Sequence, residues 1–143
     1  MQTFLPYSDF EKSAKVLDYR RLGKQRVEGY QIMKALLNLT ESKAWRNHPA
    51  TAMWRGHEGA LALYCKTMCE EWIRRGYNDS LLPFFNEYIE KLSYSPPKWL
   101  GDESFHASHR SNLLRKDYNY YSQFGWTESD DLSYVWPTKQ EAI

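Results

Sequence analysis

The sequence is poor in cysteine, in long apolar runs and in net charge. Its two cysteines, Cys65 and Cys69, lie four residues apart in a helical stretch, where a disulfide would join neighbouring turns of one helix and gain nothing. We therefore expect two reduced core residues of a cytoplasmic protein. No apolar run approaches the roughly 18 residues of a membrane span, and the amino terminus lacks the pattern of a signal peptide. Disulfide-stapled and membrane classes are therefore excluded.

Strand alternation, internal repeats and domain linkers are also absent, so residues 1–143 are expected to form one all-α domain. Ser8 to Glu11 has the pattern of a capping box. The helical segments that follow are expected near 9–39 with a break at Gly23, from Asn47-His48-Pro49 to Gly76, over 81–92, over 103–116 and briefly over 118–124. The sequence thus predicts a compact bundle of about four to five helices with an irregular, aromatic-rich C-terminal tail.

The charge balance favours a limited basic surface over a uniformly basic nucleic-acid binder. Residues 1–75 hold 13 Lys or Arg and 8 Asp or Glu, whereas residues 76–143 hold 6 and 10, which leaves the net charge of +1. One side can then meet phosphates while the other faces water. Aromatic residues reach 16%, with six Trp and eleven Tyr. Most of them should pack between helices, and the surplus can stack on bases at the surface.

The densest candidate site lies between Asp18 and Glu28. On a helix, Arg20, Arg21, Lys24 and Glu28 fall within one arc of roughly 100°. Three cations beside one carboxylate can hold a phosphate next to a catalytic acid or base. The competing interpretation is a solvated helix face with a Lys24–Glu28 ion pair.

A second cluster contains His106, His109 and Arg110, which also share one arc of a helix. Two imidazoles and a guanidinium can grip a phosphate or move a proton near neutral pH. Metal binding is disfavoured, because neither His-Glu-x-x-His nor Cys-x-x-Cys occurs. We therefore expect no metal and no cofactor.

Four further residues are weaker candidates. Arg26 leans toward the apolar side of its helix, where it needs a carboxylate or carbonyl partner. His57 interrupts an apolar stripe of its helical segment. It is interpreted either as a hydrogen-bonded core histidine or as a site residue. Arg46 and His48 lie in the connection before the second helical segment, which makes them candidates for contacting substrate.

Several motifs occur in an order that resembles a known family. They are Asp18-Tyr19-Arg20-Arg21-Leu22, the helix end Glu71 to Tyr77, Gly101-Asp102, His106, Leu113, Lys116 and Tyr120-Tyr121. In this order they resemble the pyrimidine-dimer DNA glycosylases of the phage endonuclease V type, over about residues 1–124. The runs Arg-Arg-Leu-Gly-Lys-Gln-Arg-Val-Glu and Phe-His-x-Ser-His-Arg are similar to a bacterial and phage branch of that family.

The resemblance implies a compact helical fold and a bent duplex with a flipped base. It also implies attack on the sugar C1′ by a free α-amine, which forms a Schiff base. A nearby carboxylate would stabilise the positive charge that develops on the sugar. Arg20 matches the family's phosphate-binding arginine, Arg26 can serve as the next one, and Lys116 matches in order.

The sequence departs from the family pattern at two points. The family exposes a small residue as its amine, whereas Gln2 is bulky here, so that Met1 is expected to be retained. The catalytic amine is then either that of Met1, one residue out of place, or absent. The family's catalytic glutamate aligns with Arg21. The nearest carboxylates are Asp18, about one helical turn earlier, and Glu28, about two turns later.

Three functional hypotheses remain open at this point. The leading one is a DNA glycosylase, with or without abasic-site lyase activity, that acts on a damaged or modified base in duplex DNA. The second is an enzyme of the same fold that acts on a free nucleotide or RNA, which the low net charge favours. The third is a non-catalytic module that binds nucleic acid or mediates a phage–host interaction. A monomer is favoured.

Overall fold

The computed structural model describes residues 1–41 and 45–137. The helices in these residues are α1 (Phe10–Val16), α2 (Tyr19–Leu36), α3 (Pro49–Ala52), α4 (Glu58–Arg74), α5 (Leu82–Lys91), α6 (Glu103–Lys116), α7 (Tyr118–Tyr121) and a 3₁₀ turn, η1 (Ser122–Phe124). No strand occurs in the part of the chain described, which confirms the all-α class with a few more helices than expected. None of the described helices combines the length and apolarity of a membrane span.

The first helical segment is interrupted at Asp18 and not at Gly23, so the expected break was wrong. Leu17 and Asp18 are both extended, and the Asp18 side chain accepts a hydrogen bond from the backbone N–H of Arg21, which starts a new helix. The expected capping box is also corrected, because Asp9, and not Ser8, caps α1 by accepting from Lys12 N at 3.0 Å.

The second segment is likewise two helices where one was expected. Between α3 and α4 the chain turns at Gly56, whose φ of +87° does not continue a helix. Elsewhere the boundaries agree closely with expectation. Asp102 caps α6, which runs from Glu103 to Lys116.

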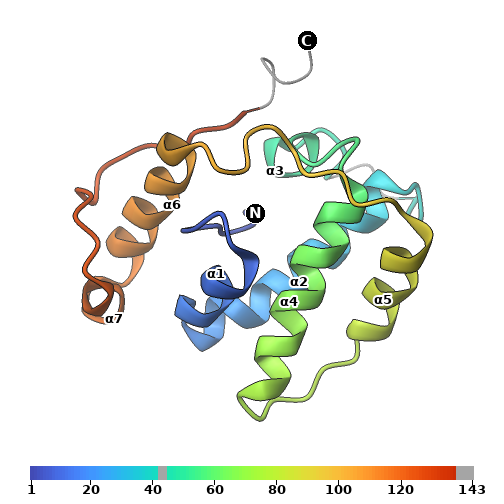
Figure 1. The fold of residues 1–143 in the computed structure, drawn as a ribbon, viewed down its shortest axis with the longest axis horizontal. Helices are drawn as coiled ribbons and strands as arrows, with labels where there is room; N and C mark the ends of the chain where they lie inside the picture. Colours follow the sequence, from blue (N-terminus) through green and yellow to red (C-terminus); the bar gives the residue numbers. More distant parts are fainter. Residues whose placement is uncertain (42–44, 138–143) are drawn as a thin grey trace.

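The centre of the fold is α4, which packs against α1, α2 and α5 (Figure 1). Gly29 of α2 meets Cys65 of α4 so closely that a Cβ at Gly29 would lie 2.3 Å from the Cys65 Sγ. Cys65 and Cys69 are buried and free, which confirms the expectation of reduced core cysteines. The lack of a side chain at Gly29 therefore allows the close contact between α2 and α4.

Replacement of Gly29 by Ala should destabilise the protein by about 1–3 kcal/mol, because overpacking outweighs the gain in helix propensity. The free energy of unfolding from urea denaturation measures this effect. Val27→Ala, on an exposed position of the same helix, is the matched control and should change stability by less than about 0.5 kcal/mol. Adding Cys65→Ala should offset part of the Gly29→Ala loss in a double-mutant cycle. A Gly29→Ala protein more stable than wild type contradicts the prediction.

Candidate active site

Residues 1–7 form a non-helical segment that lies between α6 and the α2/α4 pair (Figure 1). Its backbone is buried from Gln2 to Pro6, and side chains of the surrounding helices satisfy its polar groups. Phe4 N donates to Gln25 Oε1 at 2.7 Å, and the Tyr64 hydroxyl donates to the Phe4 carbonyl at 2.8 Å. Each such bond avoids a loss of about 1–3 kcal/mol for a buried unpaired group.

Two histidines of α6 hold the peptide groups of Leu5. The Nδ1–H of His106 donates to the Leu5 carbonyl at 2.8 Å, and Leu5 N donates to Nδ1 of His109 at 2.9 Å. Nε2 of His106 accepts from Gly101 N at 2.9 Å, so the two rings carry their protons on different nitrogens. Burial lowers the pKa of both, that of His109 to about 3. Both are therefore neutral at physiological pH.

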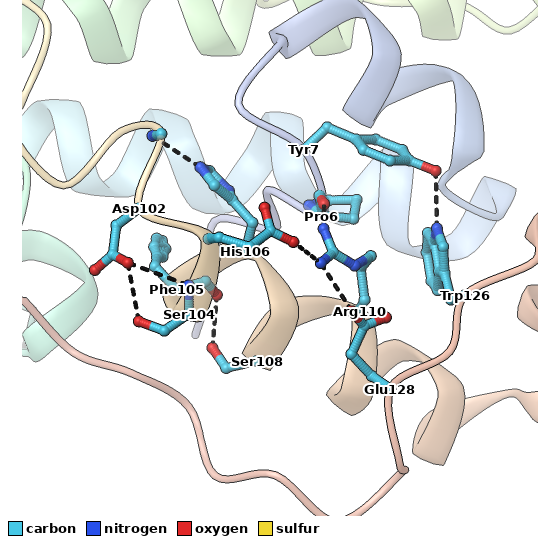
Figure 2. A network of polar contacts seen from close by, with 12 residues as sticks. Pro6, Tyr7, Asp102, Ser104, Phe105, His106, Ser108, Arg110, Trp126 and Glu128 are labelled. Atoms are coloured by element: carbon cyan, nitrogen blue, oxygen red, sulfur yellow. Dashed lines mark hydrogen bonds and ion pairs between the residues drawn. The ribbon is translucent and has the colours of Figure 1, made fainter.

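Arg110 of the same helix joins three separate segments (Figure 2). Its guanidinium donates to the Pro6 carbonyl at 2.7 Å and to Glu128 at 2.8 Å, and it also pairs with Glu103 at the start of α6. The structure thus places the expected phosphate-gripping cluster of His106, His109 and Arg110 against the N-terminal backbone, outside the cavity described next.

A cavity of about 1080 Å³ opens beside the N-terminal segment. It is lined by Met1, Gln2, Phe4, Asp18, Tyr19, Arg20, Arg21, Lys24, Gln25, Glu28, Lys116, Asp117, Tyr120 and Tyr134. Arg20, Arg21, Lys24 and Glu28, expected to share one helix face, all lie on its wall. Its volume suits a nucleotide-sized ligand.

The two candidate carboxylates lie in different surroundings. Asp18 is nearly buried and accepts from Tyr121, from Arg21 N and from the Arg21 guanidinium at 3.1 Å. Burial alone raises the pKa of Asp18, but these hydrogen bonds lower it below its usual value. The oxygens of Asp18 are therefore already used to cap α2 and to bond Tyr121 and the Arg21 guanidinium. Glu28 is half-buried and accepts only through Oε2, from Gln2 N at 3.3 Å and Gln25 Nε2 at 3.5 Å.

Three cations of the cavity wall are available for an anionic ligand. Arg20, Lys24 and Lys116 are exposed and form no ion pair with any residue in the described parts of the chain. Arg21, by contrast, is paired with Asp18. The wall therefore offers positive charge on both α2 and the end of α6, suited to a phosphate backbone.

The amino terminus lies on the same wall as Glu28. Met1 lines the cavity, and the next residue, Gln2, donates its backbone N–H to the Glu28 carboxylate. His48 lies near enough to interact electrostatically with both the amino terminus and Glu28. Burial chiefly lowers the pKa of His48, the amino terminus lowers it further, and Glu28 opposes the shift. An amine and a carboxylate are thus neighbours at the cavity.

Arg26 lies on the opposite side of α2, as its lean toward the apolar face predicted. It pairs with Asp79, whose side chain is fully buried, and its guanidinium stacks over Trp72 at 4.5 Å. Asp79 is therefore the partner, and of the two kinds that the sequence argument allowed, a carboxylate or a carbonyl, it is the carboxylate. Arg26 does not line the cavity.

The remaining candidates also lie outside the cavity wall. His48 caps α3 by accepting from Ala50 N at 3.0 Å. Its neighbour Arg46 is half-buried before that helix, and its carbonyl accepts from Arg55. His57 precedes α4 and bonds the Ser95 carbonyl through Nδ1 at 2.9 Å, so it is hydrogen-bonded as one alternative expected, but it is half-buried and not in the core.

Sequence reasoning missed several residues of the cavity wall. Gln25, which orients both Phe4 and Glu28, carried a detectable signal, because it lies one helical turn before Glu28. Tyr134 carried none, because it comes from the irregular tail. That tail is fastened to α6 where Val135 N donates to Ser108 Oγ at 3.1 Å. The aromatic tail is therefore part of the site.

Across residues 1–41 and 45–137, no three His, Cys, Asp or Glu side chains gather in a metal-binding arrangement. The cavity wall does present primary amines, the lightly bonded carboxylate of Glu28 and cations that form no ion pair with a described residue. This set fits attack by an amine on an electrophilic carbon that is held by neighbouring phosphates.

Comparison with known proteins gives one match. A family model described as pyrimidine dimer DNA glycosylase matches residues 1–82, more than half of the chain. The matched region contains α1 to α4 and the cavity residues from Met1 to Glu28. No curated protein and no solved structure matches the chain.

The buried histidines predict a pH dependence of stability. The folded state holds His109 at a pKa of about 3, whereas the unfolded chain protonates it below about 6.5. The contribution of neutral His109 to the free energy of unfolding is therefore fully present above about pH 6.5, and it is lost progressively as the pH drops toward 3. Urea denaturation at several values between pH 7.5 and 4.5 measures the slope.

His109→Phe is the test variant for this slope. It should be less stable at pH 7.5 by about 1–3 kcal/mol, since Leu5 N loses its acceptor. Its stability should also fall less steeply with acid than that of wild type, with His106 supplying the remaining slope. Identical slopes in the two proteins contradict the assignment.

Proposed function

Because this chain belongs to the pyrimidine dimer DNA glycosylase family, we propose that it excises a damaged or modified base from duplex DNA and cleaves the resulting abasic site. One observation carries the proposal. The amino-terminal residue lies on the wall of a nucleotide-sized cavity, and the carboxylate of Glu28 on the same wall is hydrogen-bonded to the next residue of the chain. An amine nucleophile and its acid–base partner are thus adjacent.

In this proposal some cations of the cavity wall bind DNA, whereas Arg21 stabilises the protein structure. Arg20, Lys24 and Lys116 hold the phosphates of the strand that enters the cavity, since they lack internal ion-pair partners among the described residues. Asp18 and Arg21 shape the wall through their mutual ion pair. The enzyme acts as a monomer in the cytoplasm and requires no cofactor.

The chemistry follows from the amine and Glu28. The uncharged α-amine of Met1 attacks C1′, the bond from C1′ to the base breaks, and the base leaves with the electron pair and takes up a proton from water. Glu28 takes a proton from the attached nitrogen and returns it to O4′ as the sugar ring opens, which leaves an imine on C1′. Glu28 then takes a proton from C2′, the C3′–O bond breaks, and the 3′ phosphate leaves with the electron pair, which cleaves the strand. Glu28 also stabilises the positive charge that develops on the sugar.

Met1, Lys24 and Lys116 all place amines near this cavity, and we assign the nucleophile to Met1 because of its position beside Glu28. α-Amines ionise nearer to neutral pH than lysine side chains, so a larger share is nucleophilic. The two lysines remain free to hold phosphate.

Borohydride reduction during incubation with an abasic or ultraviolet-damaged duplex should trap a covalent adduct. Mass spectrometry of the digested adduct should map the added sugar to the N-terminal peptide. A variant with two residues added before Met1 should give no adduct, while Lys12→Ala, outside the cavity wall, is the control and should react normally. An adduct on the Lys24 or Lys116 peptide overturns the assignment to Met1, and absence of any adduct overturns the lyase step.

Glu28→Gln should lower kcat for strand cleavage by about 10²–10⁴-fold, because the amide cannot carry the proton. Its fold should be retained, since Gln preserves an oxygen acceptor for Gln2 N. Asp18→Asn should chiefly lower the melting temperature, as it removes the charge that Tyr121 and Arg21 bond. Single-turnover kinetics and thermal melts of both variants separate the roles. Full activity in Glu28→Gln contradicts the proposal.

A further inference from the structure

Tyr134 brings the C-terminal tail into the wall of the cavity. Its ring centroid lies within 6.3 Å of the centroids of three other aromatic rings, those of Phe4, His109 and Trp136. The tail is bonded to α6 on both sides of this residue, since Leu132 N and Val135 N donate to serine hydroxyls of α6 at 3.0 Å and 3.1 Å. Ring packing and backbone bonds thus hold the phenol in a fixed position at the cavity.

The hydroxyl of Tyr134 has no hydrogen-bond partner in the parts of the chain that the structure describes. Burial raises the pKa of Tyr134 to about 12, so the hydroxyl keeps its proton at neutral pH. Arg115 and Arg21 lower this pKa, whereas Glu28 raises it, so the phenol interacts electrostatically with the carboxylate that we propose as the acid–base group. The cavity therefore contains a free O–H donor near Glu28.

Tyr120 offers a comparison within the same cavity. Its hydroxyl also lacks a partner among the described residues, and burial raises its pKa as well. The carboxylates that interact with Tyr120 are Asp18, Asp117 and Glu71, and Glu28 is not among them. Tyr120 therefore belongs to the part of the cavity beside Asp18, and Tyr134 to the part beside Glu28.

The surroundings of Tyr134 suit a neutral base better than a phosphate. The rings packed against it are uncharged at neutral pH, and the Glu28 carboxylate repels an anion. In the proposed reaction the base becomes negatively charged only as its bond to C1′ breaks. Its atom beside that bond, O2 of a pyrimidine or N3 of a purine, is a hydrogen-bond acceptor. A donor at this place meets charge that develops in the transition state.

We propose that the Tyr134 hydroxyl donates a hydrogen bond to the departing base, at the acceptor next to the bond that breaks. The inference rests on the proposed function and adds a catalytic residue to its first step. The electron pair of the broken bond passes to the base, the proton of the hydroxyl stays on Tyr134, and the base takes up its proton from water. Because the bond strengthens as the base gains charge, it lowers the barrier more than it tightens binding.

The test compares an ultraviolet-damaged duplex with the same duplex carrying a preformed abasic site, which has no base to release. Formation of the borohydride-trapped adduct is timed with enzyme in excess over DNA. Tyr134→Phe keeps the ring and should slow adduct formation on the damaged duplex by about 10- to 10³-fold, with little change in Kd. Its rate on the abasic duplex should stay within about twofold of wild type, which also shows that the variant is folded.

Tyr120→Phe is the matched variant, because it removes a hydroxyl from the other part of the cavity. It should keep the wild-type ratio of the two rates. Unchanged rates in Tyr134→Phe, or equal losses on both duplexes, overturn the role of Tyr134 and leave the proposed function standing. A wild-type protein that forms an adduct with neither duplex overturns the proposed function. An adduct with the abasic duplex alone overturns the excision step, and the role of Tyr134 with it.

Discussion

The fold depends on how the first six residues of the chain satisfy their buried backbone. No strand pairs with this segment in the described structure, so side chains from three helices supply the partners. Gln25, Tyr64, His106, His109 and Arg110 are buried polar residues for this reason. Removing any of them leaves a peptide group unpaired in the interior, a loss of about 1–3 kcal/mol. The same bonds keep the amino terminus at the cavity wall.

Local signals in the sequence predicted much of this structure. Asp102 with the polar stretch after it predicted α6, and helical spacing predicted that Arg20, Arg21 and Glu28 share a wall. These features depend on contacts within a few residues, which a sequence displays directly. The need of Arg26 for a carboxylate or carbonyl partner was equally evident, although the sequence did not identify Asp79 as that partner.

The errors arose where long-range packing decides the outcome. Gly23 was predicted to break the helix. In α2 it instead leaves room for the ring of Trp72, which follows it by 49 residues in the sequence. His106 and His109 were predicted to grip a phosphate or to move a proton, because they share a helix arc with Arg110. An arc shows which side chains point the same way, and it does not show whether water or another segment of the chain lies opposite. Here the peptide of Leu5 lies opposite both rings.

The tail from Trp126 to Pro137 runs along α6 and places Tyr134 in the cavity wall. Leu132 N donates to Ser111 Oγ at 3.0 Å and the Asn112 amide donates to the Leu132 carbonyl at 3.0 Å, so successive serines and an asparagine of one helix fix the path of the tail. Lys116, Asp117, Tyr120 and Tyr134 all lie beyond residue 82, where the family match ends. The groups that we propose to react, the Met1 amine and Glu28, thus lie inside the matched stretch, and part of the cavity wall lies outside it. If the proposed function holds, substitutions in the second stretch change which base the cavity admits, while Met1 and Glu28 stay in place.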